Sequence, residues 1–173
     1  MRANPSCAQE ETWGNIWISR NFVETPIDKL INQTKSYLCL ECGKCVASCP
    51  FELWPMTIVE EALVGFDILR GKYIWLCSTC DVCTKACPSG VRFADFVEAV
   101  RVLAISQGIT EYCLFCQRCG QYYLPIPIEE HIEEILKQKG LPSEFLDLCP
   151  RCRKYVFADK MTTSVRSRAS TMV

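Results

Sequence analysis

The sequence predicts a small, mainly helical protein that is held together by metal ligation rather than by one large apolar core. Fourteen of its 173 residues are cysteines, about 8%, near the level at which cysteine chemistry shapes a fold. One cysteine spacing occurs twice, at residues 39–50 and 77–88, which are called the two cysteine runs below. Apolar residues at helical intervals follow each run. A chain of this length holds one domain, or a domain with a small appendage.

Metal-binding thiolates explain the cysteines better than disulfides do. Disulfide-rich small proteins are exported, and residues 1–15 contain no apolar stretch typical of a secretory signal. We therefore expect a reducing compartment, the cytoplasm. No window of about 18 uncharged apolar residues is present, so no membrane span is expected. With 19 Lys plus Arg against 20 Asp plus Glu, the net charge gives no reason to expect nucleic-acid binding, and the expected partner is another protein.

The first regular element is expected just after an N-terminal extension at residues 1–24. Thr25 is a favourable N-cap, Pro26 suits the first helical position, and Asp28 lies near the positive end of the helix. A short helix therefore begins here and leads into Cys39.

Each cysteine run is followed by a predicted helix. The helix between the runs is expected to have about 14 residues and to end before Gly71. Its apolar positions are Ile58, Ala62, Leu63, Phe66 and Leu69. The helix after the second run is expected to end at Gly108, with these residues facing inward: Phe96, Val97, Val100, Leu103 and Ala104. This two-fold repeat of run and helix is assigned to a domain at residues 25–110.

The spacing within each run is typical of a cubane iron–sulfur site. Cysteines at i, i+3 and i+6 surround one turn-sized concavity, and the fourth cysteine before a proline ligates the other cluster in two-cluster ferredoxins. One [4Fe-4S] cluster is thus expected at Cys39, Cys42, Cys45 and Cys87, and the other at Cys77, Cys80, Cys83 and Cys49. Zinc is the weaker alternative, because zinc sites use pairs of thiols.

No catalytic residue is predicted in this domain. Four thiolates saturate each cluster, so no iron is open to a substrate, and the chain is expected to transfer electrons rather than to catalyse a reaction. Lys44 and Lys85 lie within the runs. They are either solvated loop residues or cations that influence the cluster potentials.

A separate four-cysteine module is expected at residues 111–159, called the C-terminal module below. Two Cys-x-x-Cys knuckles supply the ligands of a zinc-ribbon-like site: Cys116, Cys119, Cys149 and Cys152. Cys113 has the same spacing to Cys116, which leaves a different pairing or an iron site open. A helix is expected at residues 128–139 between the knuckles. The Ser/Thr-rich residues 160–173 are expected to be a mobile tail.

Other residues give weaker signals. His131, the only histidine, is expected to be a surface or half-packed side chain rather than a ligand. Trp54 and Trp75 are expected in the core or as cluster shielding. Residues 13–18 are apolar enough to pack on the chain itself or on a partner, and Cys7 is expected to be a free thiol.

The segment IWLCSTCDVCTKACPSGV at residues 74–91 resembles the second motif of helical dicluster proteins, in particular the C-type iron–sulfur subunits of heterodisulfide reductase. The resemblance extends over about residues 30–108. It implies an alpha-helical ferredoxin fold, similar to the iron–sulfur domains of succinate dehydrogenase and anaerobic glycerol-3-phosphate dehydrogenase. It also implies a hetero-oligomer in which the eight run cysteines hold two clusters. These clusters relay electrons between a flavin-containing A-type subunit and a disulfide-active B-type subunit.

Three other functions stay open at this point. The C-terminal module is not part of the minimal pattern of the C-type subunits, so the chain could be the iron–sulfur subunit of another flavin- or quinone-linked dehydrogenase. It could be an interaction scaffold that binds zinc at every cysteine site and has no redox role. It could also be an enzyme in which Cys7 or Cys113 forms a redox-active thiol beside a cluster.

Overall fold

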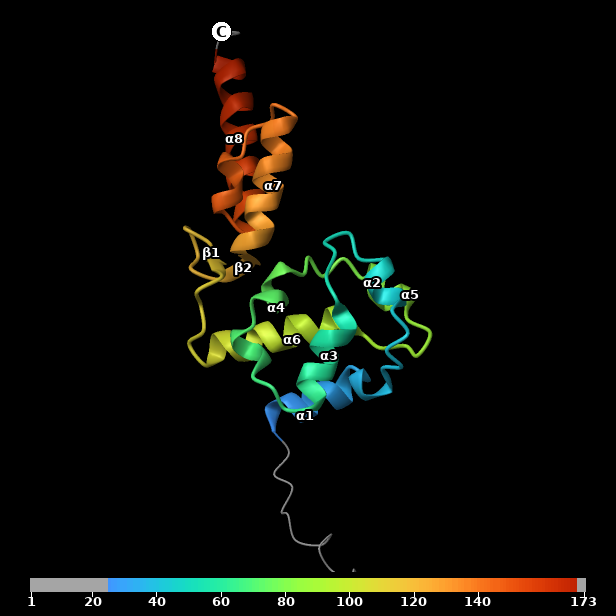
Figure 1. The fold of residues 1–173 in the computed structure, drawn as a ribbon. Coiled ribbons are helices and arrows are strands. Elements are labelled where there is room, and N and C mark those ends of the chain that lie inside the picture. The colour runs from blue at the N-terminus through green and yellow to red at the C-terminus, as the bar shows by residue number, and fades with distance from the viewer. Residues whose placement is uncertain (1–24, 171–173) are drawn as a thin grey trace, which may run out of the picture.

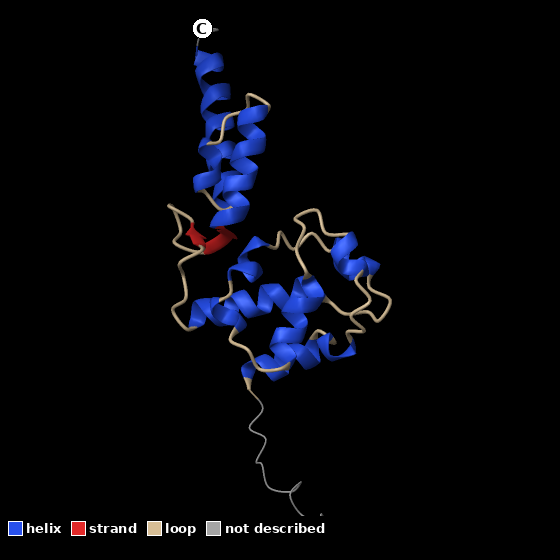
Figure 2. Ribbon diagram, in the orientation of Figure 1, coloured by secondary structure: helices blue, strands red, loops and turns tan. Residues whose placement is uncertain are grey.

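The computed structural model describes the backbone of residues 25–170 and the side chains of residues 25–161. The expectations for residues 1–24, including Cys7 and the apolar residues 13–18, lie outside this range. Within it the fold is mainly helical, as predicted, with one small sheet (Figure 2). No helix in the described part of the chain is both long and apolar enough to cross a membrane.

The cysteine runs and their helices form the larger unit (Figure 1). Its helical elements, α-helices and short 3-10 turns (η), are α1 (Pro26–Gln33), η1 (Ser36–Leu38), α2 (Lys44–Ala47), α3 (Pro55–Leu63), η2 (Ile68–Arg70), α4 (Lys72–Leu76), α5 (Val82–Ala86) and α6 (Phe93–Ser106). The remaining elements are β1 (Cys113–Phe115), β2 (Tyr122–Pro125), α7 (Ile126–Gln138), η3 (Glu144–Asp147) and α8 (Pro150–Ser170).

The predicted start of α1 is confirmed in detail. Thr25 is the N-cap, and its hydroxyl accepts a hydrogen bond from the Asp28 N–H over 3.1 Å. The Asp28 carboxylate accepts a reciprocal bond from the Thr25 N–H over 2.8 Å, which completes a capping box. These hydrogen bonds from Thr25 lower the pKa of Asp28.

The predicted single helix between the runs is wrong in length. α3 ends at Leu63, because Gly65 turns the chain with a φ of 84°. The carboxylate of Asp67 then accepts a bond from the Leu69 N–H, which starts η2. As a result Phe66, expected to face inward, is 68% exposed.

Helix α6 lies at the centre of the larger unit and contacts α1, α4, α5 and η2 (Figure 1). The core positions predicted on it are confirmed for Phe96, Val97, Val100 and Ala104, which are fully buried, and Leu103 is partly buried against them. Trp75 of α4 is also fully buried, as expected, whereas Trp54 is 59% exposed.

The two cysteine runs follow the same backbone path. In the first run Glu41 and Gly43 have φ values of 50° and 72°, and the equivalent Thr79 and Asp81 of the second run have values of 53° and 63°. Each left-handed pair precedes a short helix, α2 or α5, and these two helices contact one another. The sequence repeat is therefore a structural repeat.

The C-terminal module has more helix than a zinc ribbon. β1 pairs with β2 in an antiparallel hairpin that encloses the first knuckle. α7 begins two residues before the predicted helix and contacts α4 of the larger unit. The second knuckle lies at the start of α8, which continues to Ser170. Residues 160–170 are helical, since no glycine or proline interrupts the chain there, and the expected mobility of the tail stays a prediction.

Candidate metal centres

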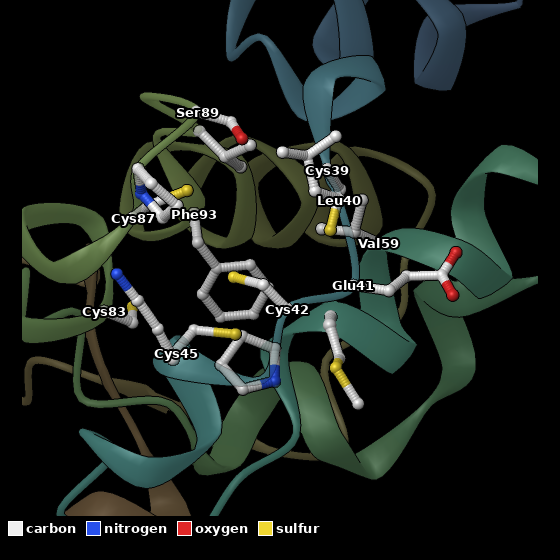
Figure 3. A pocket seen from close by; sticks show the side chains of 15 residues that line it. Cys39, Leu40, Glu41, Cys42, Cys45, Val59, Cys83, Cys87, Ser89 and Phe93 are labelled. Carbon is white, nitrogen blue, oxygen red and sulfur yellow. The ribbon is translucent and has the colours of Figure 1, made fainter.

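The first cysteine pocket lies between the two runs. Its lining contains the four cysteines expected at the first cluster, together with Cys83. Figure 3 shows the sulfur atoms of Cys39, Cys42, Cys45, Cys83 and Cys87 gathered around this cavity. Cys39 follows η1, Cys45 lies on α2, and Cys87 follows α5, so distant segments bring the thiols together. The other lining residues are mostly apolar and include Val59 and Phe93.

The second cysteine pocket adjoins the first. It is lined by the four cysteines expected at the second cluster, Cys49, Cys77, Cys80 and Cys83. Cys83, Pro55 and Phe93 line both pockets and thus form a shared wall. Each pocket combines cysteines of one run with the fourth cysteine of the other run. The structure therefore brings together the thiols of each expected ligand set, and their ligation of a cluster stays a prediction.

Both pockets have the chemistry that a thiolate-held cluster requires. Their walls are largely apolar, and the Thr79 N–H donates to the Cys77 sulfur over 3.4 Å. N–H donors of this kind stabilise negative charge on sulfur. The donor set is four soft thiols per pocket, which suits iron–sulfur clusters. The residues present therefore fit two [4Fe-4S] clusters.

Burial raises the pKa of three of the run cysteines. It raises the pKa of Cys83 to about 11 and also raises the pKa values of Cys45 and Cys77. Thiols with such pKa values carry their protons at neutral pH, and bound iron has to displace those protons.

A buried cation beside the second pocket was not singled out from the sequence. Arg101 of α6 is only 5% exposed, and its Nε donates to the carbonyl oxygen of Ile74 over 2.8 Å. Its Nη2 donates to the carbonyl oxygen of Cys77. The guanidinium also lies over the ring of Trp75, 5.9 Å from its centroid. The sequence pattern gives no signal for this, because an arginine on a helix is normally solvated.

The two knuckles of the C-terminal module meet in one tetrathiol site, formed by Cys116, Cys119, Cys149 and Cys152. Their sulfur atoms all lie within 4.8 Å of one another. Gly120 supports the first knuckle with a φ of 69°, and its N–H donates to the Cys116 carbonyl oxygen over 2.8 Å. This convergence of four thiols is the arrangement of a closed tetrahedral metal site.

The local electrostatics of the tetrathiol site favour bound metal. Backbone N–H groups, that of Cys149 first, lower the pKa of Cys116 to about 6. Burial raises the pKa of Cys152 to about 12, so a bound cation is needed to ionise this thiol at neutral pH. The guanidinium of Arg153 lies nearby, donating to the Leu148 carbonyl oxygen over 3.0 Å.

The remaining candidates lie outside these sites. Cys113 is buried against the core of the larger unit and is not part of the tetrathiol site. Lys44 and Lys85 are exposed, and only Lys44 lines a cysteine pocket. His131 is exposed, in keeping with a surface role, and belongs to no metal-ligand group within the described residues.

Comparisons with known proteins agree with the cysteine geometry. Residues 38–93 match the family model of the 4Fe-4S dicluster domain. The chain is 30% identical over 114 residues to the C-type iron–sulfur subunit of the CoB–CoM heterodisulfide reductase of Methanopyrus kandleri, covering 60% of this chain and 58% of that protein. It is 28% identical over 142 residues to a C2-type iron–sulfur subunit of the same reductase in Methanocaldococcus jannaschii, covering 73% and 75%.

A third relative is the C-type subunit of the H(2):CoB–CoM heterodisulfide, ferredoxin reductase of Methanothermobacter thermautotrophicus, at 33% identity over 113 residues and 60% of each chain. The chain spans less than two thirds of the Methanopyrus and Methanothermobacter proteins. The eight run cysteines all lie within the family match. The chain is therefore similar to C-type iron–sulfur subunits of heterodisulfide reductases, and its residues 38–93 match the 4Fe-4S dicluster domain.

Proposed function

We propose that this chain relays single electrons through two [4Fe-4S] clusters within a heterodisulfide-reductase-like hetero-oligomer. Its neighbours in the relay are a flavin-containing subunit and a thiol/disulfide-active subunit. One observation carries the proposal: two adjacent pockets each bring together three cysteines of one run and the fourth cysteine of the other. The similarity to iron–sulfur subunits supports the electron-transfer role.

The ligands of the proposed clusters are the two sets expected from the spacing. The first set is Cys39, Cys42, Cys45 and Cys87, and the second is Cys77, Cys80, Cys83 and Cys49. Each cluster, when bound, accepts and releases one electron. The chain's own residues occupy all four ligand positions, exclude water with apolar side chains, and separate the two sites only by the shared wall. Because the eight cysteines leave no ligand position on either proposed cluster for a substrate, these cysteines serve a relay and none of them is catalytic.

The tetrathiol site is proposed to hold one structural zinc ion. Four thiolates leave no open position for a substrate on the metal. A structural zinc site contributes roughly 10–16 kcal/mol of binding free energy, which is enough to fold a small module. The proposed division into a dicluster domain at residues 25–110 and a zinc module at residues 111–159 follows from these separate sites. Both kinds of site need reduced thiols, and we expect the protein in the cytoplasm.

Metal and acid-labile sulfide analysis of the anaerobically purified full chain tests the proposal. About eight iron, eight sulfide and one zinc per chain are expected, since each cubane has four irons and four sulfides. Electron paramagnetic resonance (EPR) of the dithionite-reduced protein is expected to show two interacting one-electron centres. About three zinc per chain without sulfide would instead establish a metal-stapled scaffold and end the relay proposal.

The chain's dependence on partners is tested separately. The isolated, cluster-loaded chain is expected to exchange electrons with dithionite and dyes but to reduce no disulfide substrate alone. Turnover of a disulfide by the isolated chain would contradict the relay role. A Cys113→Ser variant that loses this turnover would then identify the redox-active thiol.

A further inference from the structure

Arg101 places a positive charge inside the protein, next to the second cysteine pocket. Its guanidinium donates to the carbonyl oxygen of Cys77, which is an expected cluster ligand. A second bond runs to the carbonyl oxygen of Ile74, and Trp75 covers one face of the guanidinium. Burial lowers the pKa of Arg101 from its ordinary value. A guanidinium nevertheless stays protonated in proteins.

Within residues 25–161 no carboxylate forms an ion pair with Arg101. Glu98, one turn earlier on α6, interacts with it electrostatically, but Glu98 is exposed and screened by water. Tyr122 and Cys113 also lie near the guanidinium. Burial raises the pKa of Tyr122 to about 12 and raises that of Cys113, so both groups are neutral at physiological pH. The described residues 25–161 therefore provide no buried counter-charge.

A buried charge is costly unless an opposite charge compensates it. A cluster held by four thiolates carries net negative charge, and the second cluster would supply that compensation. A further buried group supports the same interpretation. The hydroxyl of Ser78 lines the second pocket and has no hydrogen-bond partner among the described residues. A hydroxyl of this kind can donate to a cluster or thiolate sulfur.

The first cysteine pocket has a different charge environment. The ionisable side chains that line it besides cysteines are Glu41 and Lys44, and both are exposed. Their opposite charges lie in solvent, where the effective dielectric constant is high. A buried guanidinium therefore distinguishes the second pocket from the first.

We propose that Arg101 is a positioning residue that raises the reduction potential of the second cluster above that of the first. The inference depends on the proposed function, because it assumes that both clusters are bound. Reduction adds one electron and no proton, so the reduced cluster is more negative by one charge. A fixed cation in a low-dielectric site stabilises the reduced state more than the oxidised state. An electron on this chain then resides mainly on the second cluster, beside the C-terminal module.

An EPR redox titration of the cluster-loaded full chain tests this inference, with dithionite as the reductant. The wild-type protein is expected to show two one-electron steps. In Arg101→Met the higher step is expected to move to lower potential and the lower step to stay. The expected change in the reduced-to-oxidised ratio at fixed potential is at least about tenfold, which is about 59 mV for a one-electron couple. Arg101→Lys keeps the charge and is expected to retain most of the wild-type potential.

Two further variants make the result specific. Arg153→Met is the matched control, because Arg153 also donates to a backbone carbonyl and lies over an aromatic ring, that of Phe145, but in the C-terminal module. It is expected to shift neither step. Cys80→Ser replaces an exposed ligand of the second set and alters the EPR signal of the second cluster, which assigns the higher step to a pocket.

The outcomes separate the two proposals. A wild-type chain without iron and sulfide refutes the proposed function. If iron and sulfide in Arg101→Met equal the wild-type values while neither step moves, or the lower step moves instead, the role of Arg101 is refuted. If the Arg101→Met variant does not bind the second cluster, the potential of the higher step in Arg101→Lys tests the role of Arg101 instead. A higher step at its wild-type potential supports the charge effect, and a higher step that falls to the potential of the lower step overturns it.

Discussion

The imidazole of His131 packs edge-on against the ring of Phe51, with 5.1 Å between the ring centroids. His131 lies on α7 of the C-terminal module, whereas Phe51 lines the second cysteine pocket. Trp75 of α4 stacks on Tyr112, at the start of the same module, with 6.1 Å between the ring centroids. The C-terminal module therefore covers the side of the dicluster domain that contains the second pocket.

Under the proposed zinc and cluster assignments, this packing predicts that loss of zinc weakens the second cluster. Cys149→Ser replaces a buried cysteine of the tetrathiol site. Mutation of residues that only support metal ligands lowers metal affinity by up to about 100-fold, so loss of a ligand is expected to lower zinc affinity by more than that. The unfolded module then uncovers the second pocket. In air, the EPR signal of the second cluster should decay faster than that of the first. Cys113→Ser is the control, since Cys113 lies outside the tetrathiol site, and its zinc content should equal that of the wild type. Equal decay of both signals in Cys149→Ser would contradict this coupling.

The exchange of the fourth cysteine is tested by two pairs of substitutions. Cys87→Ser is expected to alter the same EPR signal as Cys42→Ser, although these cysteines belong to different runs. Cys49→Ser should alter the other signal, together with Cys80→Ser. Serine keeps an oxygen ligand, so a changed spectrum is expected rather than a lost domain. Signals that group Cys42 with Cys49, run by run, would disprove the exchanged ligand sets.

The repeated backbone path predicts opposite effects at equivalent positions. Gly43 has a φ of 72°, so Gly43→Ala is expected to cost about 1–2 kcal/mol of folding free energy through strain, although no atom lies within 4 Å of the added Cβ. Asp81 has a φ of 63°, so Asp81→Gly is expected to cost little or to stabilise slightly. Denaturant unfolding of the cluster-free and loaded proteins measures both. Equal losses in the two variants would show that the side chains, and not the backbone, control this turn.

Two phenylalanines on the dicluster domain provide a test of its core. Phe96 is fully buried on α6, and Phe96→Ala is expected to cost about 3–5 kcal/mol of folding free energy. Phe66 is 68% exposed, and Phe66→Ala is expected to stay within about 0.5 kcal/mol. Thermal unfolding under anaerobic conditions compares them. A large loss at Phe66 in the isolated chain would mean that the turn after α3 packs more tightly than its exposure indicates.

Local signals explain what the sequence predicted well. The cap at Thr25 and the apolar face of α6 depend on residues a few positions apart, and the cysteine spacing predicts which thiols the fold brings together. Non-local features were missed. The break at Gly65 overrides a continuous apolar pattern, because a single glycine can end a helix that periodicity alone extends. The burial of Arg101 depends on where α6 meets the carbonyl groups of α4 and Cys77, which no local pattern specifies.

The pairing of each pocket with the fourth cysteine of the other run has a consequence for biosynthesis. Translation proceeds from the N-terminus, so Cys39, Cys42 and Cys45 leave the ribosome before Cys87 has been synthesised. Under the proposed ligand sets the first cluster cannot be closed until nearly the whole dicluster domain has been made. Iron delivered earlier would meet an incomplete set of three thiols. Under these sets, complete ligation of either cluster has to follow synthesis of the second run, and a chain truncated between the two runs would hold no complete ligand set.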